Sequence, residues 1–223
     1  MVLTERDKSI MNCLAKFSFL LGRHIKVLFF DGTRACDRRL KLICENQYLK
    51  REKILYGVPY LYSLAPRGQQ AIHAPVKSSK IRVDQIHHDI AVVDTVLYIM
   101  DELSIPLSDM TTEKQLHRQD GFGMRKHHPD FVFWKDNQTV SVELEMSLKA
   151  KTRLEKNIAD NFMKYDGQFW IVPDNQLKII QILEDYIRFD YSQQHFSCWL
   201  LFLYITVTVT RYRPCFIFIF MVK

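Results

Sequence analysis

The pattern of apolar and polar positions is clearest over residues 127–149. Residues 131–134 form an apolar run rich in β-formers, and residues 139–145 alternate between apolar and polar side chains, as strands do. Pro129 keeps the residue before it extended, and residues 135–138 are polar. The pattern therefore predicts a β-hairpin. Its second strand has an apolar face and a polar face, formed by Val140, Val142 and Leu144 and by Ser141, Glu143 and Glu145.

The first 64 residues have the pattern of three helices followed by two strands. Thr4 and Asp7 are spaced as a helix N-cap, and apolar positions recur after them every three or four residues. The other predicted elements are helices over residues 22–30 and 34–45 and strands over residues 48–55 and 60–64.

The third of these helices is amphipathic, with a basic outer face. At 100° per residue, Cys36, Leu40 and Ile43 fall opposite Arg34, Arg38 and Lys41. Three helices and a basic hairpin in this order are typical of a winged helix-turn-helix, which predicts duplex DNA as a partner. A solvated basic helix on a small bundle is the alternative. The predicted DNA contacts are Arg34, Arg38, Arg39 and Lys41 on the helix and Lys50, Arg51 and Lys53 on the hairpin.

A polar, Pro-containing segment at residues 74–80 predicts a linker between two domains, residues 1–74 and 81–190. In the second domain the patterns predict helices over residues 83–103, 148–164 and 177–187. They also predict strands over residues 111–118 and 169–172 beside the hairpin. The predicted order of elements is helix, three strands, helix, strand and helix. This order predicts an α/β (α+β) fold with a mixed sheet flanked by helices.

Charge and cysteine content narrow the choice of partner and compartment. Residues 1–80 contain 15 Lys and Arg against 6 Asp and Glu, whereas residues 81–223 contain 16 against 19. A basic first third indicates a polyanionic partner. The five cysteines lack metal-ligand spacing, which favours a reducing compartment, and the charged N-terminus is unlike a signal peptide. We therefore expect a cytoplasmic protein.

The segment of residues 196–223 is unusually apolar. Arg211 and Arg213 divide it into two runs, each too short to cross a membrane, so no membrane span is expected. Alternation in the first run favours strands. The segment is therefore either extra edge strands of the sheet or an aberrant, aggregation-prone end, the latter being our preferred interpretation.

Acidic residues in the predicted hairpin suggest a metal site. Asp130 begins the first strand, Glu143 and Glu145 share one face of the second, and Lys149 follows. Carboxylates in this arrangement could hold a hard divalent cation, Mg²⁺ or Mn²⁺, for phosphate chemistry. A solvated strand face is the alternative.

Several segments resemble a known family. LTERDKSIMNCL, RRLKLICENQYLKRE and YLYSLAPRG look like the N-terminal winged helix of bacterial replication-relaxation proteins. HHPDFVFW, VSVELEMSLKAKTRLEKNI and YDGQFWIVPD look like the C-terminal domain of that family, which is related to MobC-class plasmid mobilisation relaxases. The second domain also resembles the restriction-endonuclease-like fold of PD-(D/E)XK nucleases. Together these resemblances span residues 3–187.

The resemblance implies a bacterial protein that binds plasmid-origin DNA, works with other mobilisation or replication proteins, and nicks one strand. It implies Asp130, Glu143 and Glu145 as catalytic metal ligands and Lys149 as the catalytic cation, with Glu113 and His88 as further candidates. The chain departs from the nuclease pattern because Glu145 stands where lysine is usual. The alternative function is therefore a non-catalytic DNA-binding accessory or transcriptional regulator with a degenerate nuclease fold.

Overall fold

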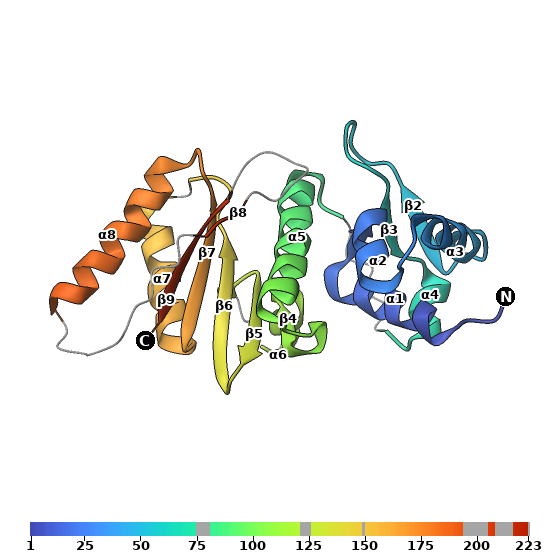
Figure 1. The fold of residues 1–223 in the computed structure, drawn as a ribbon, viewed down its shortest axis with the longest axis horizontal. Coiled ribbons are helices and arrows are strands. Elements are labelled where there is room, and N and C mark those ends of the chain that lie inside the picture. Colours follow the sequence, from blue (N-terminus) through green and yellow to red (C-terminus); the bar gives the residue numbers. More distant parts are fainter. Residues whose placement is uncertain (75–80, 121–125, 149, 194–204, 208–215, 223) are drawn as a thin grey trace. The chain divides into compact units, whose positions relative to one another are not determined.

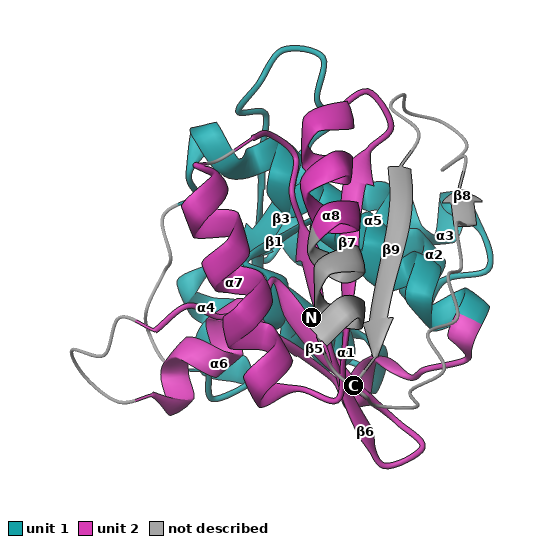
Figure 2. Cartoon of the chain, turned by 90° about the vertical axis from the view of Figure 1, so that its left-hand side faces the viewer, with its two compact units in different colours: residues 1–102 teal, residues 103–223 magenta. Residues whose placement is uncertain are grey.

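The computed structural model describes residues 1–74, 81–120, 126–148, 150–193, 205–207 and 216–222. The chain divides into two compact units, residues 1–102 and 103–223 (Figure 2). Together they form a mixed α/β structure with two sheets, one antiparallel and one mixed. Among the described residues, no helix combines the length and the apolar composition that crossing a membrane requires.

Unit 1 begins with three helices and a small antiparallel sheet of order β1-β3-β2 (Figure 1). The predicted helices and hairpin are confirmed, whereas the three-residue strand β1 was not predicted. The hairpin strands are shorter than expected because residues 53–60 form the loop between them. The elements are α1 (Glu5–Phe17), β1 (Phe19–Leu21), α2 (Gly22–Phe29), α3 (Thr33–Glu45), β2 (Leu49–Glu52), β3 (Leu61–Leu64) and α4 (Pro66–Ala71).

A buried carboxylate ties α3 to α1. Asp7 closes the capping box predicted at the start of α1, since its Oδ2 accepts the Thr4 N–H at 2.7 Å. The side chain of Asp7 is fully buried, and its carboxylate also accepts from Arg39 of α3, with Nε 2.8 Å from Oδ1 and a second contact at Oδ2. Burial alone would raise the pKa of Asp7, but the bonds from Arg39 and Thr4 outweigh it and hold that pKa below its usual value.

A second ion pair, partly buried, joins helix α5 (Ile86–Leu103) to α2, and the short helix η1 (Val83–Gln85) precedes α5. Asp94 accepts two bonds of 2.7 Å from Arg23 and lies 3.1 Å from Nε2 of His24. Nδ1 of His24 accepts the Leu21 N–H, so Nε2 carries the proton that Asp94 accepts. Unit 1 extends to Glu102 and includes most of a helix that was expected in the second domain. Residues 75–80 of the predicted linker lie outside the described residues.

Unit 2 is built on a six-stranded sheet of order β4-β5-β6-β7-β9-β8 (Figure 1). The β6–β7 pair is parallel and the other pairs are antiparallel. As predicted, the hairpin leads through a crossover helix to a parallel strand. The elements are η2 (Leu107–Asp109), β4 (Met110–Thr112), α6 (Glu113–Gln119), β5 (Phe131–Lys135), β6 (Gln138–Leu144), α7 (Lys151–Lys164), β7 (Gly167–Pro173), α8 (Leu177–Gln193), β8 (Ile205–Val207) and β9 (Phe216–Val222).

Two predictions for this unit need correction. The strand predicted over residues 111–118 ends at Thr112, because Thr112 and Gln115 form a capping box that starts helix α6. The apolar C-terminal segment is not an aberrant end where the structure describes it. Instead, β9 pairs along the whole of β7, and β8 pairs with β9. The other interpretation, extra edge strands, therefore fits the described residues.

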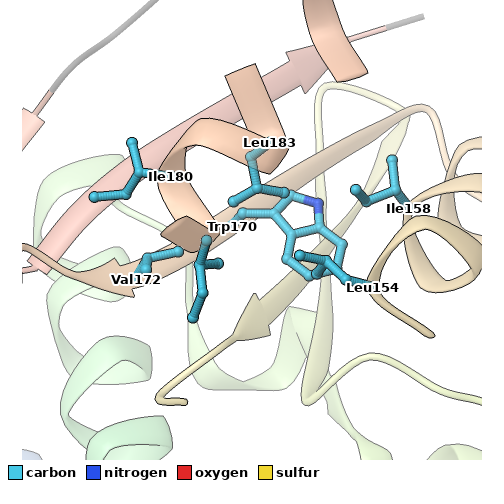
Figure 3. Close-up of a cluster of buried hydrophobic side chains, with 7 residues drawn as sticks. Leu154, Ile158, Trp170, Val172, Ile180 and Leu183 are labelled. Carbon is cyan, nitrogen blue, oxygen red and sulfur yellow. The ribbon is translucent and has the colours of Figure 1, made fainter. Parts of the chain in front are cut away.

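The hairpin turn and the helix packing position the acidic face of β6. Asp136 and Asn137 both have positive φ angles, 50° and 63°, as a two-residue type I′ turn requires. Helices α7 and α8 pack their apolar residues against one face of β7, around the fully buried Trp170 (Figure 3). The indole N–H of Trp170 donates to Oε1 of Gln168 at 2.8 Å, so this buried donor is paired.

The Asp7–Arg39 pair gives a stability prediction with a matched control. Arg39→Ala leaves a carboxylate uncompensated in the core and should lower the free energy of unfolding by about 3 kcal/mol. Arg38→Ala removes the same charge from an exposed position and should change it by less than about 0.5 kcal/mol. Urea unfolding of both variants measures the difference. Equal stabilities would show that Arg39 does not compensate Asp7.

Candidate functional site

The strongest candidate site lies where β5 begins and β6 ends. The β5–β6 register pairs Phe131 with Val142, which places the preceding residue, Asp130, opposite Glu143 on the same face of the sheet. Oδ2 of Asp130 accepts the Leu144 N–H at 2.7 Å. Two of the predicted metal-binding acids are thus brought together by strand pairing.

Glu143 is held by two side chains that were not predicted as site residues. The carboxylate is buried, and its Oε1 accepts from Nε2–H of His127 at 2.7 Å and from Nδ2–H of Asn161 at 3.0 Å. Asn161 is a buried polar residue of α7, one turn from Ile158 on the helix face that covers the sheet. Two asparagines, Asn157 and Asn161, among the apolar residues of the buried helix face were the sequence signal that could have identified it.

Burial is the main reason that the pKa of Glu143 is raised. The hydrogen bond from His127 lowers it, the charge of Asp130 raises it further, and the bond from Asn161 lowers it. Ionising both carboxylates therefore costs free energy that a cation near them would recover. The bonds from His127 and Asn161 both fall on Oε1. Two neighbouring carboxylates with these properties fit a hard divalent ion such as Mg²⁺ or Mn²⁺.

The remaining predicted catalytic residues have different positions. Glu145 is buried just beyond β6, and its N–H donates to the Ile171 carbonyl at 3.0 Å. Lys149 lies outside the described residues. Glu113 begins helix α6 and does not lie on a strand. His88 belongs to α5 in unit 1, with Nδ1 3.7 Å from Oδ1 of the adjacent Asp89.

A second polar cluster, His117, Asp120 and His128, lies between α6 and the start of β5, with ligand-type atoms within 4.8 Å of one another. The sequence pattern did not predict it, because His117 was expected on a strand and Asp120 in a loop. Charges from both clusters act on the hydroxyl group of Tyr165. Burial, followed by the charges of Glu143 and Asp120, raises the pKa of Tyr165 to about 12. The buried Tyr165 hydroxyl has no hydrogen-bond partner within the described part of the chain.

The predicted DNA-contacting residues divide into two groups. Arg34, Arg38 and Lys41 are exposed on the outer face of α3, as the helical pattern predicted. Arg39 differs from them, because its guanidinium neutralises the buried Asp7 and therefore holds α3 in place, while its contact with DNA stays a prediction. Helical periodicity alone did not separate Arg39 from its neighbours, since Asp7 lies 32 residues away in the sequence.

The hairpin cations gather on an aromatic ring. Arg51 stacks 3.9 Å from the centre of the Tyr60 ring, and Nζ of Lys53 lies 5.7 Å from it. Lys50 is exposed on β2. Stacking restricts these long side chains and keeps their charges on the loop between β2 and β3.

A groove of about 830 Å³ runs along α3 beside the first turn of α1. Arg38 and Lys41 line it from α3, together with Leu42, Phe30 and Arg6, and the Arg6 guanidinium lies 4.9 Å from the centre of the Phe30 ring. The groove thus adjoins the exposed basic face of α3 and extends its positive charge.

Comparison of the chain with family models, with curated proteins and with solved structures finds no match in any of the three. What this protein does is therefore inferred from the geometry of its two units.

Proposed function

We propose that this protein binds duplex DNA through unit 1 and cleaves a phosphodiester bond, with a divalent cation, at Asp130 and Glu143 of unit 2. The observation that carries the proposal is the strand register that places these two carboxylates opposite each other on one face of the sheet. Single-stranded nicking at a plasmid origin, together with other mobilisation or replication proteins in a bacterial cytoplasm, is the biological setting that the family resemblance implies.

The order of elements in unit 1 supports DNA binding. Helix, strand, two helices and an antiparallel hairpin follow one another as in a winged helix-turn-helix, with α3 as the recognition helix and residues 53–60 as the wing. The exposed face of α3 is basic, and cations also gather on Tyr60 in the wing. Positive charge on both elements suits contacts with the phosphates on either side of a groove of duplex DNA.

The arrangement of unit 2 supports hydrolysis. Three antiparallel strands, a crossover helix and a parallel strand agree with the order expected of a restriction-endonuclease-like core. Asp130 and Glu143 would hold Mg²⁺ or Mn²⁺, which when bound lowers the pKa of a coordinated water and offsets charge on the phosphate. His127 and Asn161 fix the orientation of Glu143 through hydrogen bonds to its Oε1.

Non-catalytic DNA binding is the second candidate function. Glu145 occupies the position where nucleases of this pattern carry lysine, and Glu143 is already hydrogen-bonded to two side chains. A buried, satisfied polar network of this kind can serve structure alone. In that case unit 2 acts as a binding or regulatory module.

The basic face of α3 can be tested by charge removal. Replacing Arg34, Arg38 and Lys41 with alanine should weaken duplex binding and flatten its salt dependence, by about one unit of slope for each phosphate that the protein no longer neutralises. Alanine at three exposed lysines of unit 2, Lys135, Lys156 and Lys178, is the charge-matched control. Fluorescence anisotropy at several salt concentrations measures both. Similar losses of affinity in the two triple variants would assign the effect to net charge and not to α3.

The carboxylate pair gives a metal and pH prediction. Burial raises the pKa of Glu143 in the folded protein above its pKa in the unfolded chain, which is about 4.3. The free energy of unfolding of the wild type therefore falls as pH rises from the unfolded pKa through the folded one. Glu143→Gln should therefore melt above wild type at pH 8 without metal, and this difference should shrink toward pH 4.

In the same melting experiment, Mg²⁺ at about 100 times its Kd should stabilise wild type by about 2.7 kcal/mol and leave Glu143→Gln and Asp130→Asn unchanged. Asp136→Asn, at the opposite end of the hairpin, is the control and should respond as wild type does. An Mg²⁺-induced shift that survives both site variants would place the ion elsewhere.

Cleavage itself separates the two candidate functions. Wild-type protein with Mg²⁺ should convert supercoiled plasmid carrying the cognate origin to the open-circular form. Asp130→Asn should nick at least about 100-fold more slowly while binding the same DNA with unchanged affinity. If wild-type protein binds the origin but leaves it supercoiled with Mg²⁺ and with Mn²⁺, the non-catalytic function is correct.

A further inference from the structure

The cluster of His117, Asp120 and His128 brings together side chains from two elements. His117 lies in the last turn of α6, Asp120 follows three residues later as the C-cap of that helix, and His128 precedes β5. Residues three apart on a helix share one face, so His117 and Asp120 both face His128. The two imidazole rings meet edge to face, with centroids 4.7 Å apart.

The orientation of His117 is set by an outer carboxylate. Nε2 of His117 lies 3.4 Å from Oε1 of Glu113, one turn earlier on α6, while Nδ1 lies 4.0 Å from Oδ2 of Asp120. In the tautomer protonated at Nε2, Glu113 accepts that proton and the Nδ1 lone pair is directed toward Asp120. A histidine that donates one ring proton to a carboxylate and presents its other nitrogen to an ion is the usual arrangement of metal-binding histidines.

His128 supplies the third group from a buried position. Only 3% of its surface is exposed, and its Nε2 is in close contact with Oδ2 of Asp120. A hydrogen bond between these two atoms carries a proton, which a metal ion displaces when it binds. Nitrogen and oxygen atoms within 4.8 Å of one another need only small side-chain rotations to surround one ion.

From this geometry we propose that Nδ1 of His117, the Asp120 carboxylate and Nε2 of His128 bind a first-row transition-metal ion of the Zn²⁺ class. Two imidazoles and one carboxylate suit Zn²⁺ and Co²⁺ better than Mg²⁺, which prefers oxygen ligands. Three protein ligands also leave a fourth position for water. This site is separate from the carboxylate pair of Asp130 and Glu143 and does not depend on the function proposed for it.

Lys164 opposes the ion and thereby makes the proposal testable. Its Nζ lies 3.4 Å from Nδ1 of His128. A metal on Nε2 requires the proton of His128 to move to Nδ1, where an ammonium group is an unfavourable neighbour. Lys164 is exposed and can rotate away, so it should weaken metal binding without preventing it. A chain of hydrogen bonds from Asp120 through His128 to Lys164, with no ion, is the competing arrangement.

Titration of the full-length protein with Co²⁺, followed by its visible absorption and by competition with Zn²⁺, tests the site. Wild type should bind one equivalent with the intense band of a low-symmetry site. His117→Gln, Asp120→Asn and His128→Gln should each weaken binding at least about 100-fold, and Glu113→Gln should weaken it about 10-fold. Lys164→Met should tighten it. Glu143→Gln and the exposed control His87→Gln should bind as wild type does.

His117→Gln is the decisive variant, because His117 is exposed and its replacement should leave the fold intact. Loss of Co²⁺ binding in a folded His117→Gln protein, with tighter binding by Lys164→Met, supports the site. Wild-type protein that does not bind Co²⁺, or a His117→Gln variant that binds it with unchanged affinity, overturns the proposal and leaves the hydrogen-bonded chain as the function of these residues.

Discussion

The pairing of β5 with β6 is the constraint on which the candidate chemistry of this protein depends. Strand side chains alternate between faces, so a slip of one residue would turn Glu143 away from Asp130 and bury Val142 or Leu144 against the wrong layer. The register is fixed at the turn, where Asp136 and Asn137 adopt left-handed conformations without glycine. It is also fixed by the Leu144 N–H, which donates to Asp130. The site and the sheet are thus specified by the same hydrogen bonds.

Ion pairs between helices have a comparable role in unit 1. Asp7 and Asp94 each lie among helices and are each neutralised by an arginine, Arg39 and Arg23. Breaking such a pair is costly even where the intact pair adds little net stability. Not all of the basic charge of this unit is therefore available to a polyanion, because Arg39 holds α3 to α1 and Arg23 holds α2 to α5. The charge that faces solvent is concentrated on α3 and on the loop after β2.

Local patterns in the sequence predicted most elements, because the helices and the hairpin of both units have regular apolar periods. The alternation of apolar and polar residues predicted the wrong element where a helix-capping signal was also present. Thr112 and Gln115 cap a helix inside a stretch that reads as a polar strand. The pattern also could not predict contacts between residues that lie far apart in the sequence. Arg39 cannot be distinguished from Arg38 without knowing that Asp7 lies beneath it, and Asn161 approaches Glu143 only after α7 packs on the sheet.

The adjacent residues His127 and His128 bring one side chain to each of the two polar clusters. Their imidazoles face different carboxylates, Glu143 and Asp120, so a displacement of this one dipeptide moves a partner of each cluster. The spacing between the two clusters is therefore tied to a single peptide unit just before β5.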